Sequence, residues 1–242
     1  MKPFLILQLR ENDDAADGEF EAFLKYGELS HDEVVRVRME RDELPTIDPD
    51  TYSGILVGGG PWNVSDHEKG PRQREAEAWL HHLLDRIVAG DFPYLGACYG
   101  LGALTASRGG IVSKERYGEN VGAVDVDLTD EATRDPVLAG LPGRFRAFVG
   151  HKEACQTLPS GAVWLAKSST CPFQMYRLGH NVYGCQFHPE LDAEVLCVRI
   201  DVYKNAGYFP PEEAESLKGL VSKETITVPM QILRRFVERY RR

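Results

Sequence analysis

The sequence predicts an α/β fold in which helices cover both faces of a mostly parallel central sheet, with a smaller antiparallel sheet added. The first hundred residues alternate short apolar runs with amphipathic segments, which is the rhythm of a parallel sheet with covering helices. From about residue 120, short strands separated by turn residues follow one another and predict antiparallel pairs. Between the two halves, a strand leads into a tight turn that holds Cys98.

Three strands are expected before the first long helix. Residues 3–9, PFLILQL, form a continuous apolar run, as a strand buried on both faces requires. Residues 33–39 alternate apolar side chains with Arg36 and Arg38, which is strand period. Residues 54–61, GILVGGGP, form another buried strand that runs into three glycines.

Two helices are expected before the cysteine turn, one after the first strand and one after the third. Residues 19–27 carry apolar side chains at helical spacing and end in a glycine. Residues 71–89 form a wide apolar stripe, begin with Pro71, which suits a first helical turn, and are closed by Gly90. Residues 92–98, FPYLGAC, then supply the strand that leads into the turn.

The second half is expected to contain short strands and then helices. Gly179 and His180 predict a hairpin, and Asp192 can cap a helix that reaches Tyr203. The expected strands are GAVDVDL (122–128), RFRAFVG (144–150), AVWLAKS (162–168), PFQMYRL (172–178) and NVYGCQF (181–187).

The tail after Gly207 predicts two further amphipathic helices, which start near Pro211 and Pro229. We therefore expect residues 1–206 to form the main domain and residues 207–242 a C-terminal helical extension.

The composition excludes several classes of partner. The chain is 43% apolar and 27% charged, as expected for a soluble globular protein. Its formal net charge of −9 argues against nucleic acid or an anionic membrane surface as the main partner. No apolar run approaches the length of about 18 residues that a membrane span needs. The N-terminal stretch has no small-residue cleavage site and predicts a first strand, so we expect a cytoplasmic protein.

The cysteines and histidines show no pattern of a disulfide framework or a metal site. The five cysteines lie far apart, are odd in number and include no C-x-x-C pair. The seven histidines lack ligand spacing, and the adjacent His81 and His82 point to different faces of an expected helix, which favours a solvated role. We expect no metal and no cofactor.

The stretch YLGACYGLGALT, residues 94–105, places Cys98 between Gly96 and Gly100. The spacing G-x-C-x-G suits a sharp strand-to-helix turn, because the chain passes close by and flanking side chains would clash. It favours a nucleophile held on that turn. A free cysteine is also a common small core residue, so burial in the core is the alternative.

A cysteine nucleophile needs a base, because the free thiol has a pKa of about 8.5. The stretch YGCQFHPE places His188 at the end of an expected strand, followed by Pro189 and Glu190. If the chain stays extended through the proline, His188 and Glu190 project to the same side. Glu190 can then hold one imidazole nitrogen and direct the other toward the thiol. The alternative is a surface histidine and a solvated glutamate that share a turn.

This arrangement would make Cys98 the one cysteine that is rapidly alkylated at neutral pH. A helix N-terminus and His188 would both lower the pKa of its thiol. The other four, Cys155, Cys171, Cys185 and Cys197, should react slowly.

The glycine turn at 58–60 can supply donors for an oxyanion. Backbone N–H groups next to glycine can approach a substrate closely. Gly59 and Gly60 fit this role after a buried strand, with the amide of Tyr99, the residue after the cysteine, as a second donor. The alternative is a tight turn without such a function.

Together, GGGP, GACYG and FHPE, in that order, resemble the class I glutamine amidotransferases, most closely the amidotransferase domain of GMP synthase and its stand-alone relatives. The resemblance covers residues 3–200 and is most specific over 165–192. It implies a flavodoxin-like fold and a Cys98 nucleophile that attacks the side-chain amide of glutamine. It further implies that His188 is the base and acid, oriented by Glu190.

The same resemblance implies that Gly60 and Tyr99 furnish the oxyanion amides, that water resolves a glutamyl thioester, and that ammonia is the useful product. The sequence departs from the family where members often read C-x-G-x-Q, because Gly102 replaces the glutamine. His151 is retained in GHKE at 150–153, but its neighbours differ. Free glutamine, a γ-glutamyl peptide or another small amide would all suit this chemistry.

Two functional hypotheses follow. The first is an amidohydrolase that uses Cys98. It would act either as a transferase that donates ammonia to a partner or as a hydrolase that cleaves a γ-glutamyl amide. The second is a catalytically silent member that binds a ligand or partner through the same cleft. Retention of Cys98, His188 and Glu190 favours the first. Because no phosphate-cradling loop occurs in the chain, a separate synthetase subunit would have to accept the ammonia.

Gly102 leads to a prediction about substrate choice. The missing glutamine side chain would bond the charged amino-acid part of glutamine, and each such bond is worth about 1.5–3 kcal/mol. Losing one should weaken glutamine binding about tenfold or more. We therefore expect free glutamine to be a poor substrate and Gly102→Gln to lower its Michaelis constant in steady-state kinetics. A wild-type protein that saturates at micromolar glutamine, with the variant no better, would contradict this.

Overall fold

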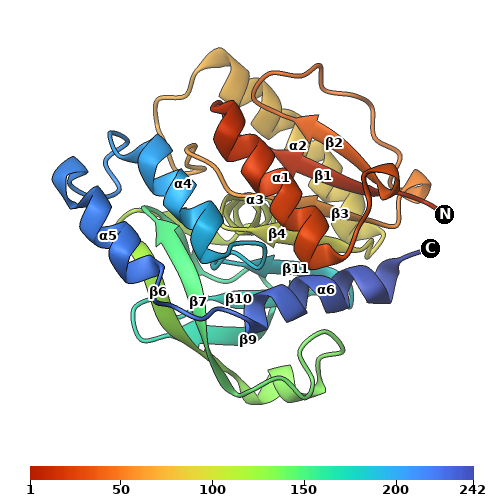
Figure 1. Ribbon diagram of the computed structural model, residues 1–242. Coiled ribbons are helices and arrows are strands. Elements are labelled where there is room, and N and C mark those ends of the chain that lie inside the picture. Colours follow the sequence, from red (N-terminus) through yellow and green to blue (C-terminus); the bar gives the residue numbers. More distant parts are fainter.

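The computed structural model describes all residues from Met1 to Arg242, and its centre is one nine-stranded sheet (Figure 1). The first five strands in spatial order are parallel, and the other four join them through antiparallel pairs. The order is β2 (Val34–Arg38), β1 (Phe4–Gln8), β3 (Gly54–Val57), β4 (Tyr94–Ala97), β11 (Val182–Cys185), β10 (Met175–Leu178), β9 (Val163–Ser168), β6 (Glu119–Leu128) and β7 (Arg144–His151).

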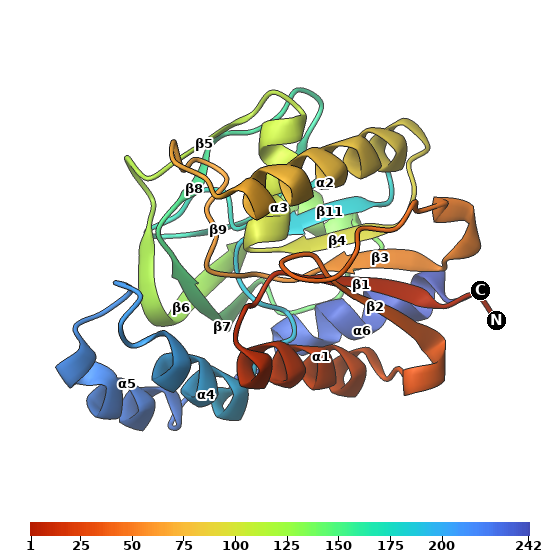
Figure 2. The same cartoon turned by 90° about the horizontal axis from the view of Figure 1, so that it is seen from above.

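Helices cover both faces of this sheet, which confirms the predicted fold class. Figure 2 shows α2 (Pro71–Ala89) and α3 (Tyr99–Ser107) on one face. The opposite face carries α1 (Asp13–Gly27), α4 (Ala193–Tyr203), α5 (Ala214–Val221) and α6 (Val228–Tyr240). Short 3-10 turns occur at His31–Glu33, Pro49–Thr51, Asp130–Arg134 and Pro211–Glu213.

A second, two-stranded antiparallel sheet pairs β5 (Ile111–Ser113) with β8 (Ala154–Thr157). These two strands were not expected from the sequence, because three or four residues are too few to show a clear period. β8 begins directly after the loop 151–153, so this small sheet fixes the position of that loop.

Two elements differ from their expected form. The first helix begins at Asp13, six residues before the expected range, because Asn12 caps it by accepting a hydrogen bond from the Ala15 amide at 3.0 Å. In β2, Arg38 is buried and Val35 is exposed, so the expected alternation is wrong there. Arg38 is accommodated because its Nε donates to the Glu40 carboxylate at 2.6 Å.

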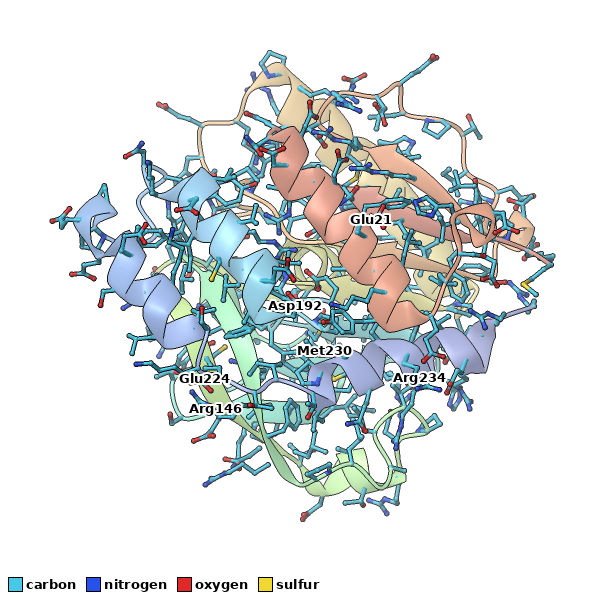
Figure 3. All side chains as sticks on the ribbon, viewed as in Figure 1. Glu21, Arg146, Asp192, Glu224, Met230 and Arg234 are labelled. Carbon is cyan, nitrogen blue, oxygen red and sulfur yellow. The ribbon has the colours of Figure 1, made fainter.

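The C-terminal helices are attached to the sheet and to α1 by polar contacts (Figure 3). Asp192 caps α4, as predicted, by accepting from the Val195 amide at 2.8 Å, and it also accepts from Lys25 of α1 at 3.0 Å. Arg146 of β7 donates to Glu224, between α5 and α6, at 3.1 Å. No helix in the structure is both long and apolar enough to cross a membrane.

Helix α6 belongs to the main core. Four of its side chains, Ile232, Leu233, Phe236 and Val237, are fully buried in the hydrophobic cluster that also contains β1 and β11 side chains. The ring of Phe236 packs edge-on against Tyr183 of β11, with 6.1 Å between ring centroids. Burial of these rings ties the end of the chain to the centre of the sheet.

This packing predicts that truncation of one α6 side chain destabilises the whole protein. Phe236→Ala should lower the free energy of unfolding by about 3–5 kcal/mol, since it leaves a cavity in the core. Chemical denaturation measures this, with the exposed Gln231→Ala on the same helix as control. A Phe236→Ala protein as stable as the control would show that α6 unfolds independently of the sheet.

Candidate active site

Cys98 lies on a strained turn between β4 and α3. Its backbone has φ 50° and ψ −99°, a region that residues other than glycine seldom adopt. Its amide donates to the carbonyl of Cys185 at 2.8 Å, which ties the turn to the neighbouring strand β11. The Cys98 side chain is half-buried, whereas Cys155, Cys171 and Cys185 are buried. The turn therefore presents its sulfur to a cleft rather than to the core.

The flanking glycines are required by close packing, as the sequence pattern predicts. A Cβ atom at Gly96 would lie 2.6 Å from the backbone carbon of Gly100. One at Gly100 would lie 3.1 Å from the side chain and backbone of Val57 on β3. Side chains at either position would push the turn away from the sheet.

The triple glycine after β3 makes room for other parts of the site. A Cβ at Gly58 would lie 2.5 Å from the Glu19 carboxylate, and one at Gly59 would lie 2.6 Å from Cε1 of His188. At Gly60 the obstacle is Leu9, also at 2.5 Å. These three glycines thus allow close approach, and none of them has a positive φ.

His188 and Glu190 form a buried pair. The Nδ1 atom of His188 lies 2.8 Å from Oε1 of Glu190. Glu190 is fully buried and His188 is 6% exposed, so the alternative of a surface histidine and a solvated glutamate is wrong. His188 and Cys98 line the same cavity. With Nδ1 held by Glu190, the other ring nitrogen, Nε2, is left for contacts outside this pair.

Two arginines and a second carboxylate surround this pair, and sequence reasoning missed all three. Arg199 of α4 donates from Nη2 to Glu190 at 3.0 Å and to Glu19 of α1 at 3.3 Å. Arg10, just after β1, donates from Nε to Glu19 at 2.8 Å. The only signal for Arg10 was its place at the end of a buried apolar strand.

Burial sets the protonation of the histidine. The pKa of His188 is lowered, chiefly because burial disfavours the imidazolium, and Arg199 and Arg10 lower it further. Burial alone would raise the pKa of Glu190, but His188 and Arg199 hold it well below its usual range. At neutral pH the pair is therefore a neutral imidazole beside a carboxylate, and such an imidazole can accept a proton.

The thiol of Cys98 differs from the expectation of a lowered pKa. Burial raises the pKa of the Cys98 thiol to about 12, and the nearby Arg10 charge offsets this only in part. Glu153 and Glu190 raise it further. The expectation that the helix N-terminus lowers the pKa of this thiol is wrong, because the loss of hydration outweighs the effect of the helix. Cys98 is thus a neutral thiol at neutral pH.

Two cavities meet at Cys98. Both are bordered by Gly60, Cys98, Gly150 and Tyr208. The first lies on the His188 side and is walled by apolar residues of α4 and the loop after it. The second extends toward more polar residues: Tyr99, Gly102, His151, Lys152 and Glu153.

Gly60 borders both cavities, and Tyr99 borders the second. Gly60 N–H makes no hydrogen bond within the protein. Tyr99 N–H lies in the first turn of α3, where no helix carbonyl can accept from it. Neither amide donates to a backbone carbonyl, and the Tyr99 N–H is directed at the Cys98 sulfur, where it opposes the rise in the thiol pKa.

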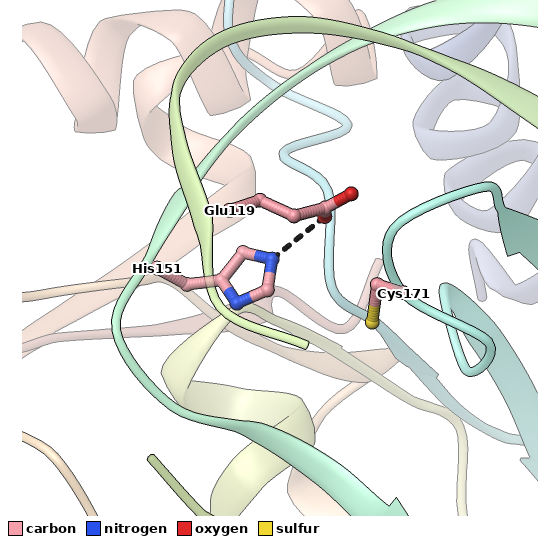
Figure 4. Close-up of side chains that lie close together, drawn as sticks. All are labelled: Glu119, His151 and Cys171. Atoms are coloured by element: carbon pink, nitrogen blue, oxygen red, sulfur yellow. Dashed lines mark hydrogen bonds and ion pairs between the residues drawn. The ribbon is translucent and has the colours of Figure 1, made fainter. Parts of the chain in front are cut away.

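His151 lines the second cavity but its ring is engaged elsewhere (Figure 4). Its Nε2 lies 2.8 Å from a Glu119 oxygen, and its Nδ1 lies 2.8 Å from the carbonyl of Glu153. Cys171 is close by. The Glu119 carboxylate also accepts hydrogen bonds from Ser168, Thr170 and Gln174. The cluster is a hydrogen-bond network that positions the Glu153 loop.

Gly102 faces Glu153. A Cβ at Gly102 would lie 3.4 Å from Oε1 of Glu153 and 3.5 Å from Val64. Glu153 is fixed there because its oxygens accept from the amides of Val64 and Ser65, each at 2.8 Å. A glutamine side chain at position 102 would extend into space that Glu153 occupies, so the benefit expected from Gly102→Gln requires Glu153 to move.

The family model for class I glutamine amidotransferases matches residues 16–196. The chain belongs to this family. Among curated relatives, GMP synthase of Thermomicrobium roseum is 32% identical over 67% of the chain and 28% of its own length. A glutamine-hydrolysing GMP synthase subunit of Methanoculleus marisnigri is 33% identical over 59% of the chain and 67% of its own length. The chain thus spans less than a third of the first of these synthases.

Solved structures show the same fold. A glutamine amidotransferase from Thermotoga maritima superposes with a TM-score of 0.77 at 21% identity, over 99% of this amidotransferase chain and 98% of the other. One from Methylobacillus flagellatus gives 0.73 at 23% identity, over 99% and 94%. Because both superpositions cover 99% of this chain, they include α5 and α6, and these helices are part of the shared fold.

The loop after α4 also contributes residues to the two cavities. Part of this loop belongs to residues 207–242, which were expected to form an extension of the main domain. Tyr208 borders both cavities that meet at Cys98. Lys152 holds this loop, because its Nζ donates to the carbonyl of Ala206 at 2.6 Å and lies 4.4 Å from the centre of the Tyr208 ring. The signal in the sequence that could have indicated this role is the presence of aromatic residues in an otherwise polar tail.

The raised thiol pKa predicts how Cys98 reacts with iodoacetamide. Because the thiol is neutral well above pH 7, its thiolate fraction and its labelling rate should rise about tenfold per pH unit up to about pH 9. Peptide mass spectrometry measures the rate at each site, with Cys98→Ser as control. A fast rate that does not change between about pH 6 and pH 8 would instead reveal a preformed thiolate.

Proposed function

We propose that this chain is a cysteine-dependent amidohydrolase that cleaves the side-chain amide of glutamine or of a γ-glutamyl compound through a glutamyl thioester. The observation that carries the proposal is the strained Cys98 turn, which shares one cavity with the buried His188–Glu190 pair. Membership of the class I glutamine amidotransferases supports the same chemistry.

The first half of the reaction forms the thioester. Sγ of Cys98 attacks the γ-carbonyl carbon while the thiol proton passes to Nε2 of His188. The carbonyl oxygen becomes an oxyanion that accepts hydrogen bonds from the amides of Gly60 and Tyr99. The C–N bond then breaks, the imidazolium returns the proton to the leaving nitrogen, and an amine or ammonia departs.

The second half returns the free enzyme. Water attacks the thioester carbon while His188 takes one of its protons, and the C–S bond breaks. The proton returns to the Cys98 sulfur, and glutamate leaves. The reaction needs no cofactor, since both steps move only protons and one acyl group.

Glu190 and Arg199 support His188 in this cycle. Glu190 accepts from Nδ1–H, which fixes the tautomer that leaves Nε2 free as a base, and it stabilises the transient imidazolium. Arg199 donates at 3.0 Å to Oε1 of Glu190, the same oxygen that faces Nδ1 of His188. Because Arg199 also bonds Glu19, it anchors the histidine pair to α1.

The second cavity is proposed to hold the glutamyl part of the substrate. Glu153 supplies a fixed carboxylate there that suits the α-ammonium group, and it lies beside Gly102. This assigns to Glu153 the contact that the absent glutamine side chain at position 102 would otherwise provide. His151 acts through its hydrogen bond to the Glu153 carbonyl.

Where ammonia is the product, a separate synthetase subunit is proposed to receive it. Two curated relatives bear the name of a single glutamine-hydrolysing subunit of GMP synthase, which supports this arrangement. The second candidate is a γ-glutamyl amide hydrolase that works alone, and the apolar lining of the first cavity favours it. A silent binding protein would retain the fold without turnover.

The orienting role of Glu190 predicts a loss of turnover. Glu190→Gln should lower kcat for the best amide by about a hundredfold or more, since the imidazole loses its orientation and its counter-charge. His188→Ala should be worse. Coupled ammonia or glutamate detection measures the rate, and the exposed Glu194→Gln on α4 is the matched control.

An electrophilic glutamine analogue followed by mass spectrometry provides the second readout. Modification of Cys98 in the wild type and in Glu190→Gln shows that the nucleophile and the fold survive the substitution. An unchanged rate in Glu190→Gln would reduce the site to a Cys–His pair. Absence of both modification and amide cleavage in the wild type would establish a silent member.

A further inference from the structure

One donor in the first cavity has no role in the mechanism above. Arg10 is 4% exposed, and two of its nitrogens are engaged: Nε donates to Glu19 at 2.8 Å and Nη1 to the Tyr203 hydroxyl at 3.3 Å. Its Nη2 makes no hydrogen bond in the protein and is not sealed from solvent. Since Arg10 lines this cavity, Nη2 offers an unpaired cationic donor to its contents.

The position of this donor places it beside the histidine. A Cβ at Gly59 would lie 3.3 Å from Nη2 of Arg10 and 3.2 Å from Nε2 of His188. Both nitrogens therefore approach the same small glycine. In the proposed reaction, Nε2 gives its proton to the departing nitrogen, so the group attached to that nitrogen leaves on the Arg10 side.

Apart from Arg10, Arg199, His188 and Cys98, most of the residues that line this cavity are apolar or aromatic. Side chains of Val121, Val149, Leu196, Ile200 and Phe209 wall it, and its enclosed volume of about 60 Å³ opens to solvent, so that a larger group can extend outward. Ammonia is a small polar molecule and gains nothing from apolar walls or from a cationic donor. An anionic group on an apolar body matches both features, because the body would bury apolar surface and the anion would accept from Nη2.

We infer that the first cavity binds the leaving amino acid of a γ-glutamyl dipeptide whose C-terminal residue is apolar. Its carboxylate accepts a hydrogen bond from Nη2 of Arg10, and its side chain packs against the apolar wall. This inference rests on the proposed function and narrows it, since the preferred substrate is then a secondary amide rather than free glutamine.

The reaction balances without any further reactant. Cys98 attacks the γ-carbonyl carbon, the C–N bond to the leaving residue breaks, and His188 delivers the former thiol proton to that nitrogen. The free amino acid departs from the Arg10 side. Water then hydrolyses the thioester, so that one γ-glutamyl dipeptide and one water yield glutamate and one amino acid.

The test is a two-by-two comparison of substrates. γ-Glutamyl-leucine and γ-glutamyl-glycine are each assayed as the free acid and as the C-terminal carboxamide, with glutamine as reference. Release of the amino acid or its amide measures kcat/KM. The acid should exceed the amide about tenfold or more, as expected for one charge-assisted hydrogen bond. Leucine should exceed glycine about tenfold or more, since each buried methylene contributes about fourfold and burial of about two of them already gives this factor.

Variants separate the contribution of the carboxylate from that of the apolar side chain. Arg10→Gln should bring the ratio of acid to amide close to one, and Arg10→Lys, which keeps the charge if the first variant folds poorly, should retain part of it. Val121→Asn, at a half-buried position in the wall, should lower the ratio of leucine to glycine and leave the ratio of acid to amide unchanged. Thermal melting confirms that each variant is folded.

Two outcomes would overturn the inference while the proposed function stands. The first is a kcat/KM for glutamine that equals or exceeds the value for γ-glutamyl-leucine. The second is an Arg10→Gln variant that slows all five amides by one common factor, which would place Arg10 in the chemical step. Failure of the proposed function is distinguishable, because then no amide, glutamine included, is cleaved by the wild type.

Discussion

The close approach of His188 to Gly59 is the contact on which the candidate site depends. The imidazole reaches the cavity beside Cys98 only because position 59 has no Cβ, which would lie 2.6 Å from the ring. The same glycine run admits the Glu19 carboxylate at Gly58. A backbone without side chains at these positions therefore lets a histidine pair and its supporting charges share one small buried volume.

Buried charges of this density are tolerated because each has a partner. Removing an ion from water costs several kcal/mol, and only good geometry and further hydrogen bonds offset that cost. Glu19 accepts from Arg10, Arg199 and Gln8, and Arg199 bridges Glu19 to Glu190. The network joins β1, α1, α4 and the segment after β11, so the orientation of the histidine is coupled to the packing of the whole fold.

The parallel part of the sheet explains why these residues meet. The neighbouring strands β1, β3, β4 and β11 all end at one edge, and Arg10, the glycine turn, Cys98 and His188 each follow one of them. Loops at the carboxyl ends of adjacent parallel strands form a crevice, which is where ligands bind in such sheets. The helix α4 and the loop that carries Tyr208, which come from the C-terminal part of the chain, then close this crevice.

The sequence by itself determined the strands of the central sheet, the long helix 71–89, the cysteine turn and the pairing of His188 with Glu190, because each depends on local spacing that the chain carries within a few residues. The tertiary structure alone decided which groups surround His188 and Cys98. Arg10, Glu19 and Arg199 come from separate elements and meet only after β1, α1 and α4 pack together. The raised pKa of Cys98 was likewise beyond local reasoning, since the helix N-terminus is visible in a motif, but the loss of hydration depends on every segment that covers the sulfur.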